Sequence, residues 1–221
     1  MQFGINRNKP QNKSDFNGLS NIKNQHDLRL NQLKDNKSIN NRSLYLKGPA
    51  TRYHDPIDKT PGRIQGNSRR WGDATIETKT EVIREIIRSA KDLNYSLEET
   101  AFALLVARLE SGFNPDAAAL GSTAAGVGQL VERTGIGVGL SPEDAFDYQQ
   151  NTKAMLLYIK DRMEFVKKRY PDISTEEQFK YTYAHYHAGN ILQYGGLEIS
   201  AKQIMPNFNR LISMLKAKIS E

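Results

Sequence analysis

From about residue 75 to the C-terminus, apolar residues recur at the spacing of an α-helix. The clearest run contains Val82, Ile83, Ile86, Ile87, Ala90 and Leu93. Apolar side chains three or four residues apart lie on one face of a helix. No segment shows the convincing two-residue alternation that is typical of a half-buried β-strand. The sequence therefore predicts a mainly α fold for this part of the chain.

Three motifs indicate where helices begin. Two are capping boxes, in which a serine is followed three residues later by a glutamate. The third has a serine cap, a proline at the first helical position and acids in the first turn. The motifs are Ser96–Glu99, Ser174–Glu177 and Ser141–Asp144. We expect these helices to end near residues 110, 189 and 168, and a last helix to begin near Pro206. The helix after Ser96 is apolar on most faces, which predicts that it is buried.

Residues 1–70 have a different composition. They contain 14 Lys and Arg against five Asp, eleven Asn, and four of the eight prolines, whereas the whole chain has a net charge of +6. A segment with so few apolar residues cannot bury enough surface to offset the entropy of ordering it. We therefore predict a basic, largely disordered arm at residues 1–70 and a helical domain at residues 71–221.

Two interpretations of the arm stay open. It is either a solvated tail or a segment that contacts an anionic partner, such as a cell-envelope polymer or a delivery apparatus. Its aromatic residues are few and well separated, so they do not form a nucleic-acid-binding motif. They are Phe3, Phe16, Tyr45 and Tyr53.

The composition also excludes several kinds of site. The chain has no cysteine, which excludes disulfides, cysteine-based zinc sites and thiol nucleophiles. His185 and His187 are two residues apart and do not share a helix face, so neither a metal ion nor another cofactor is expected. No apolar run is long enough to cross a membrane. The basic N-terminus is not followed by the apolar core of a signal peptide, and none is expected.

Glu110 stands at the end of the predicted buried helix, directly before a loop rich in Gly, Asn and Pro. A glutamate there is costly unless it faces a cleft or a partner. Burial would favour its protonated form, and a protonated carboxyl group near neutral pH can act as a general acid. The alternative is a solvated glutamate, or one paired with Arg108 or Arg133.

Three segments resemble motifs of the soluble lytic transglycosylases, and they occur in the order found in that family. They are Glu110–Ala117, Gly121–Leu130 and Ala184–Asn190, with Asn151 and Tyr158–Ile159 between them. The resemblance extends from about residue 81 to residue 215. It implies a lysozyme-like helical domain of the goose type, preceded here by the basic arm.

The resemblance also implies the roles of individual residues. Glu110 would be the catalytic acid and later the base. Tyr186 would lie against its carboxylate, and Ser111 would form a hydrogen bond nearby. The remaining residues with implied roles in binding substrate or shaping the cleft are Phe113, Asn114, Gln129 and His187. The chain departs from the family at Gly128, His185 and His187, where Met, Ala and Asn are usual.

The implied substrate is the glycan strand of peptidoglycan. The implied reaction breaks the β-1,4 bond from N-acetylmuramic acid to N-acetylglucosamine and closes the C6 hydroxyl onto C1, giving a 1,6-anhydro end. The enzyme would act on the cell wall or in the periplasm, delivered by phage lysis, by a virion or by a specialised secretion system. Hydrolysis stays open, with Asp116, Asp144 or Asp147 as a second carboxylate. A wall-binding structural component without catalysis is a further alternative.

Overall fold

The structure is a computed structural model that describes residues 51–189, 192 and 195–219. Its elements are α2 (Ile76–Asp92), α3 (Leu97–Ser111), α4 (Glu132–Gly137), the 3₁₀ turn η1 (Glu143–Phe146), α5 (Tyr148–Arg169), α6 (Thr175–Ala188), α7 (Gly196–Ile199), the π-helical turn η2 (Ser200–Ile204) and α8 (Met205–Ile219). In these residues, β-structure is limited to isolated bridges within the loop between α3 and α4. The predicted mainly α fold is therefore confirmed.

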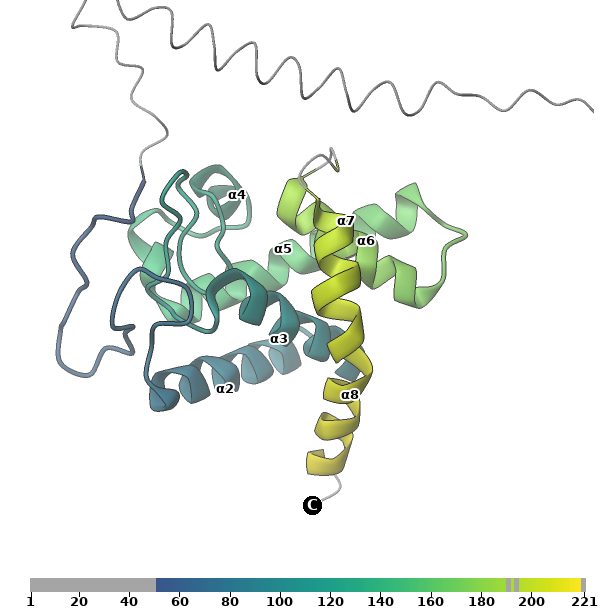
Figure 1. The fold of residues 1–221 in the computed structure, drawn as a ribbon, viewed down its shortest axis with the longest axis horizontal. Helices are drawn as coiled ribbons and strands as arrows, with labels where there is room; N and C mark the ends of the chain where they lie inside the picture. Colours follow the sequence, from purple (N-terminus) through teal and green to yellow (C-terminus); the bar gives the residue numbers. More distant parts are fainter. Residues whose placement is uncertain (1–50, 190–191, 193–194, 220–221) are drawn as a thin grey trace, which may run out of the picture. The chain divides into compact units, whose positions relative to one another are not determined.

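Helix α3 runs through the core, as its apolar sequence predicts. Residues 101–107 are all buried. Helices α2 and α8 pack directly on α3, and α5 packs against both α2 and α6 (Figure 1). Full burial of one large apolar side chain contributes about 1.5–3 kcal/mol. The largest completely buried apolar side chains are Ile86, Phe102, Met155, Leu156, Ile159 and Ile204.

Both predicted capping boxes are formed. In the first, the Ser96 hydroxyl accepts a hydrogen bond from the Glu99 backbone N–H at 3.1 Å, and the Glu99 carboxylate accepts one from the Ser96 N–H at 2.8 Å. Ser174 and Glu177 form the same arrangement at the start of α6. These bonds satisfy backbone donors that the first turn of a helix leaves without partners.

The segment after Ser141 differs from its prediction. The chain forms only the short turn η1 there, and α5 begins later with Asp147 as its cap. Asp147 Oδ1 accepts hydrogen bonds from the backbone N–H groups of Gln149 at 3.0 Å and Gln150 at 2.8 Å. Asp147 has an extended backbone, with φ −72° and ψ 115°, which separates the two helical pieces. Helix α4 lies in a glycine-rich stretch where the sequence suggested no helix.

Residues 51–70, the described part of the predicted arm, pack on the helical body. Their main attachment is the completely buried carboxylate of Asp116. Arg63 donates to its two oxygens at 2.8 and 2.9 Å, Arg69 donates at 3.2 Å, and the Gly66 N–H donates at 2.8 Å. The arm was predicted to be disordered up to residue 70, but this buried charge holds residues 63–69 on the domain. The rest of that prediction, residues 1–50, lies outside the described residues.

Among the helices of the described segments, none combines the length and the apolar character needed to cross a membrane.

Candidate active site

Glu110 lies in the last turn of α3, and its side chain is 15% exposed. The helix ends directly after it because Gly112 adopts a left-handed backbone with φ 60°. A Cβ atom at Gly112 would lie 2.6 Å from the Cα of Gly72, so the close approach of the segment before α2 also requires glycine. The buried helix thus holds the carboxylate at the point where the chain leaves the core.

Two side chains of α6 approach the same oxygen of Glu110. The Tyr183 hydroxyl donates a hydrogen bond to Glu110 Oε1 at 3.0 Å. His187 Nδ1 lies 3.8 Å from that oxygen, which is within ion-pair range but longer than a hydrogen bond. The two rings stack, with centroids 5.8 Å apart, because residues 183 and 187 are one helical turn apart.

The electrostatics of this cluster favour a neutral tyrosine and a charged histidine. Burial raises the pKa of Tyr183, and the nearby Glu110 carboxylate raises it further, so Tyr183 remains a donor near neutral pH. The Glu110 carboxylate also raises the pKa of His187 above its ordinary value, against the opposing effect of partial burial. The charge of Glu110 therefore influences the protonation of both Tyr183 and His187.

Tyr186 does not make the direct contact with Glu110 that the sequence analysis assigns to it. Its hydroxyl donates to the Gly128 carbonyl at 2.5 Å, and its ring is buried against Tyr158 at a centroid distance of 5.0 Å. Burial is the main cause that raises the pKa of Tyr186, and the Glu110 charge is the second. Tyr186 therefore lies near the carboxylate but holds the glycine-rich loop, and Tyr183 supplies the hydroxyl.

Gly128 fits this arrangement because it has no side chain. A Cβ atom there would lie 2.8 Å from Met155 Cβ and 2.9 Å from the Tyr186 hydroxyl. The loop is also held by Asn151, which is completely buried in α5. Its Oδ1 accepts from the Gly128 N–H at 2.8 Å, and its Nδ2 donates to the Ala125 carbonyl at 3.2 Å. Met155 and Tyr186 thus fill the space that a side chain at position 128 would need.

Ser111 and Asn114 have internal hydrogen bonds. The Ser111 hydroxyl donates to the Ala107 carbonyl at 3.1 Å within α3, rather than to Glu110. The Asn114 amide donates to the carbonyls of Ser68 at 2.8 Å and Arg70 at 2.7 Å. Both side chains are completely buried. They hold the loop after Glu110 in place and are not in a position to bind a ligand directly.

Phe113 and Gln129 share an unusual backbone. Both have positive φ angles, 61° and 47°, a conformation that is strained for residues other than glycine. The Gln129 amide donates to the carbonyls of Ala117 and Gly126, each at 2.9 Å, so the side chain fixes the turn in which it lies. Phe113 lines a groove beside α3 and α8 that is described below.

The three aspartates considered as a second carboxylate have other partners. Asp116 is buried under Arg63 and Arg69, Asp144 accepts from the Ser141 hydroxyl at 2.9 Å, and Asp147 caps α5. In the part of the chain that the structure describes, no group of three or more metal-binding side chains is close enough to hold an ion. Glu110, Tyr183 and His187 therefore form the clearest reactive cluster among these residues.

Sequence reasoning missed Tyr183. The available signal was its spacing, since residues 183 and 187 are one helical turn apart and share a face.

Comparison with protein families assigns part of the chain to a known type of domain. Residues 86–191 match the family model described as the transglycosylase SLT domain. The chain matches no curated protein and no solved structure. The matched range includes Glu110, Tyr183 and His187, whereas residues 51–85 and α8 lie outside it. Residues 86–191 are therefore a transglycosylase SLT domain with a lysozyme-like helical fold.

Proposed function

We propose that the chain is a lytic transglycosylase that cleaves the N-acetylmuramic acid to N-acetylglucosamine bond of peptidoglycan and leaves 1,6-anhydro ends. The SLT domain supports peptidoglycan cleavage of this general type. The observation that carries the specific proposal is the position of Glu110, which ends the buried helix and is contacted by Tyr183 and His187.

In the first step, protonated Glu110 gives its proton to the glycosidic oxygen, and the bond from C1 to that oxygen breaks. Tyr183 orients the carboxyl group through Oε1 and stabilises the carboxylate that the proton transfer leaves. No described residue donates a hydrogen bond to the second oxygen, Oε2, which is the one we assign to substrate. The substrate's own acetamido group stabilises the positive charge that develops at C1.

In the second step, the Glu110 carboxylate removes the proton from the C6 hydroxyl of the same muramic acid. The C6 oxygen then bonds to C1 and closes the anhydro ring, so Glu110 ends the cycle protonated, as it began. A tethered nucleophile has a large entropic advantage over a free water molecule. This reaction needs only one carboxylate, which fits the engagement of Asp116, Asp144 and Asp147 elsewhere.

The other predicted site residues fit supporting roles in this proposal. Ser111 and Asn114 hold the chain on either side of the turn after Glu110. Gln129 and Tyr186 shape the loop whose backbone at residues 126–128 would contact the glycan.

Substitution of the acid tests the proposal. A general acid typically contributes about 10²–10⁴-fold to a rate, so Glu110→Gln is expected to lose that much wall-clearing activity. Glu164→Gln, an exposed position on α5, is the matched control and should keep full activity. Unchanged clearing by Glu110→Gln would remove this residue from the mechanism.

Mass spectrometry of the digested wall tests the reaction type. Anhydro ends are expected, whereas reducing muramic acid ends would show hydrolysis on the same fold. A wild-type protein that binds walls but releases no fragments would instead be a non-catalytic binder.

A further inference from the structure

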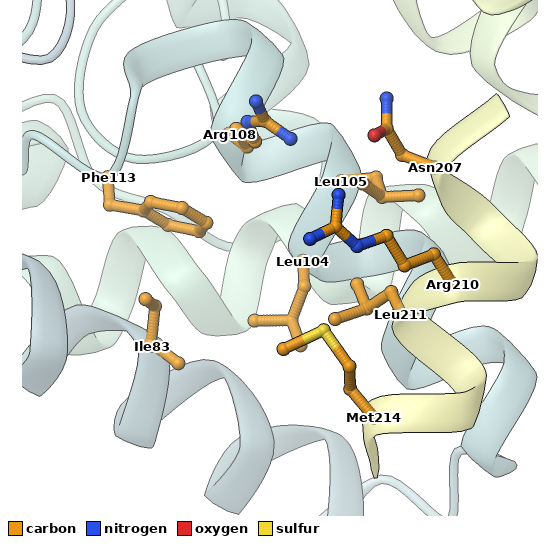
Figure 2. A pocket seen from close by; sticks show the side chains of 9 residues that line it. All are labelled: Ile83, Leu104, Leu105, Arg108, Phe113, Asn207, Arg210, Leu211 and Met214. Carbon is orange, nitrogen blue, oxygen red and sulfur yellow. The ribbon is translucent and has the colours of Figure 1, made fainter. Parts of the chain in front are cut away.

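A groove outside the candidate active site combines an apolar floor with two arginines. It has a volume of about 370 Å³ and lies between α2, α3 and α8 (Figure 2). The apolar residues that line it are Ile83, Leu104, Leu105, Phe113, Leu211 and Met214, and the polar ones are Arg108, Asn207 and Arg210. Met214 is 53% exposed at the edge of this apolar surface.

The groove is separate from the Glu110 cluster. Leu104 and Arg108 are one turn apart on α3 and share a face. Glu110 follows two residues later, about 200° further round the helix. Its carboxylate faces Tyr183 of α6, whereas the groove faces α2 and α8. An inference about the groove therefore holds whether or not Glu110 is catalytic.

The two arginines lack an acidic partner. Arg108 and Arg210 are exposed, none of the residues that line the groove is acidic, and neither guanidinium pairs with a carboxylate of the described segments. Several other guanidiniums of the body, such as those of Arg63, Arg69 and Arg88, do have such partners. Figure 2 shows Arg108 and Arg210 reaching over the groove from α3 and α8. Two like charges above one apolar surface are complementary to an anion.

The shape and lining of the groove narrow the class of ligand. A glycan would need many hydrogen-bonding groups, and Asn207 is the single amide among the lining residues. The volume lies in the range of small-molecule pockets. The chain's own residues 1–50 are a poor charge match, because they hold nine Lys and Arg against three Asp.

We propose that this groove binds an amphiphilic anion, with its apolar chain on the leucines and Met214 and its carboxylate or phosphate head between Arg108 and Arg210. Such an anion is either free in solution or the head and chain of a membrane lipid. Both sources offer the same chemistry to the groove.

Calorimetric titration of the full chain with decanoate and decyl phosphate, each below its critical micelle concentration, tests the proposal. Binding of one molecule per chain is expected. The double variant Arg108→Gln/Arg210→Gln should weaken it about tenfold or more, because hydrogen bonds to charged groups are lost. Met214→Gln should also weaken the binding, because it replaces an apolar side chain that lines the groove with a polar one. Arg133→Gln, an exposed arginine on α4, is the matched control and should bind normally.

Three results would overturn the proposal. The first is equal binding of decyltrimethylammonium, which has the same chain and the opposite charge. The second is unchanged affinity in the double arginine variant, with circular dichroism confirming its fold. The third is binding of an acidic amphipathic peptide with no binding of either amphiphile, which would assign the groove to a protein partner.

Vesicle sedimentation separates the two sources of the ligand. If phosphatidylglycerol vesicles retain the wild type better than the double arginine variant, the ligand is a membrane lipid. If both proteins sediment equally but differ in calorimetry, the ligand is a free amphiphile. Both variants keep residues 1–50, so any contribution of that basic segment cancels in the comparison.

Discussion

The carboxylate of Glu110 is contacted asymmetrically, since Tyr183 and His187 both approach Oε1. The tyrosine donates a proton in a hydrogen bond at every pH below its raised pKa. The histidine acts through its charge, which depends on pH. The two neighbours of one oxygen therefore have separable effects on Glu110, and substitutions can distinguish them.

Tyr183→Phe removes the hydroxyl and keeps the ring. We expect kcat on solubilised peptidoglycan to fall about 10–100-fold, because a hydrogen bond to a charged group contributes about 1.5–3 kcal/mol. Tyr181→Phe is the matched control, since the Tyr181 ring packs on Tyr170 and makes no described contact with Glu110. Equal losses in the two variants would indicate a general packing defect and contradict a specific role for Tyr183.

His187→Asn tests the electrostatic effect. The pKa of His187 is raised above its ordinary value of 6.5 by Glu110. His187 is therefore charged below pH 6.5 and loses its charge as the pH rises through the folded-state pKa. Below that pKa the wild type carries an imidazolium 3.8 Å from Glu110 Oε1, and the variant carries none. The kcat/KM profile of the variant should therefore lack the change that the wild type shows as His187 loses its charge.

The control for this experiment is His54→Asn, the same change at an exposed position outside the matched domain. Tyr183 and Tyr186 also interact with Glu110, and both stay neutral in the relevant range because burial raises their pKa values. A His187→Asn profile that superimposes on the wild type would show that the imidazole does not influence the acid.

At the scale of single residues, the sequence identified a carboxyl group at the end of a buried helix but not its hydrogen-bonding partner. Family motifs pointed to Tyr186, but Tyr183 lies only about 60° away from it around the helix, so helical spacing alone does not distinguish the two tyrosines. Which tyrosine faces Glu110 depends on the rotation of α6 against α3, a tertiary property that no local pattern encodes.

At the scale of elements, the predictions that held depend on local chemistry. The capping boxes at Ser96 and Ser174 use residues three positions apart and form as expected. The start of α5 was misplaced because Ser141 and Asp147 are both good caps, and the helix begins after the second. Residues 63–69 were assigned to a disordered arm because composition contains no information about a carboxylate about 50 residues away.

Asp116→Asn tests whether this distant carboxylate holds the segment before α2. Removal of one partner from a buried ion pair costs about 3–5 kcal/mol, so the free energy of unfolding in urea should fall by about that amount. Hydrogen exchange at the Gly66 amide, which donates to Asp116, should accelerate. Asp172→Asn, at an exposed position, should change stability by no more than about 0.5 kcal/mol. A stable variant with a protected Gly66 amide would contradict this role.

At the scale of the whole molecule, the net positive charge lies in residues 1–50, whereas the SLT domain lies in the body. Residues 1–50 contain nine Lys and Arg against three Asp, which equals the net charge of +6 of the complete chain. The described body has balanced charges and carries the SLT domain. We therefore expect long-range attraction to anionic envelopes to come from the N-terminal fifty residues, and the proposed cleavage of peptidoglycan from the body.

Two N-terminal deletions test this division and locate its boundary. Removal of residues 1–50 should leave the thermal unfolding midpoint unchanged, and it should abolish the part of binding to isolated cell envelopes that decreases with salt. Removal of residues 1–70 should also destabilise the body, because Asp116 would lose both Arg63 and Arg69 and become a buried, uncompensated charge. Circular dichroism on heating and envelope sedimentation at low and physiological salt measure the two effects. If the two deletion variants are equally stable, the boundary of the folded body lies at residue 70. If salt-dependent binding to cell envelopes is unchanged without residues 1–50, the attraction to the envelope comes from the body.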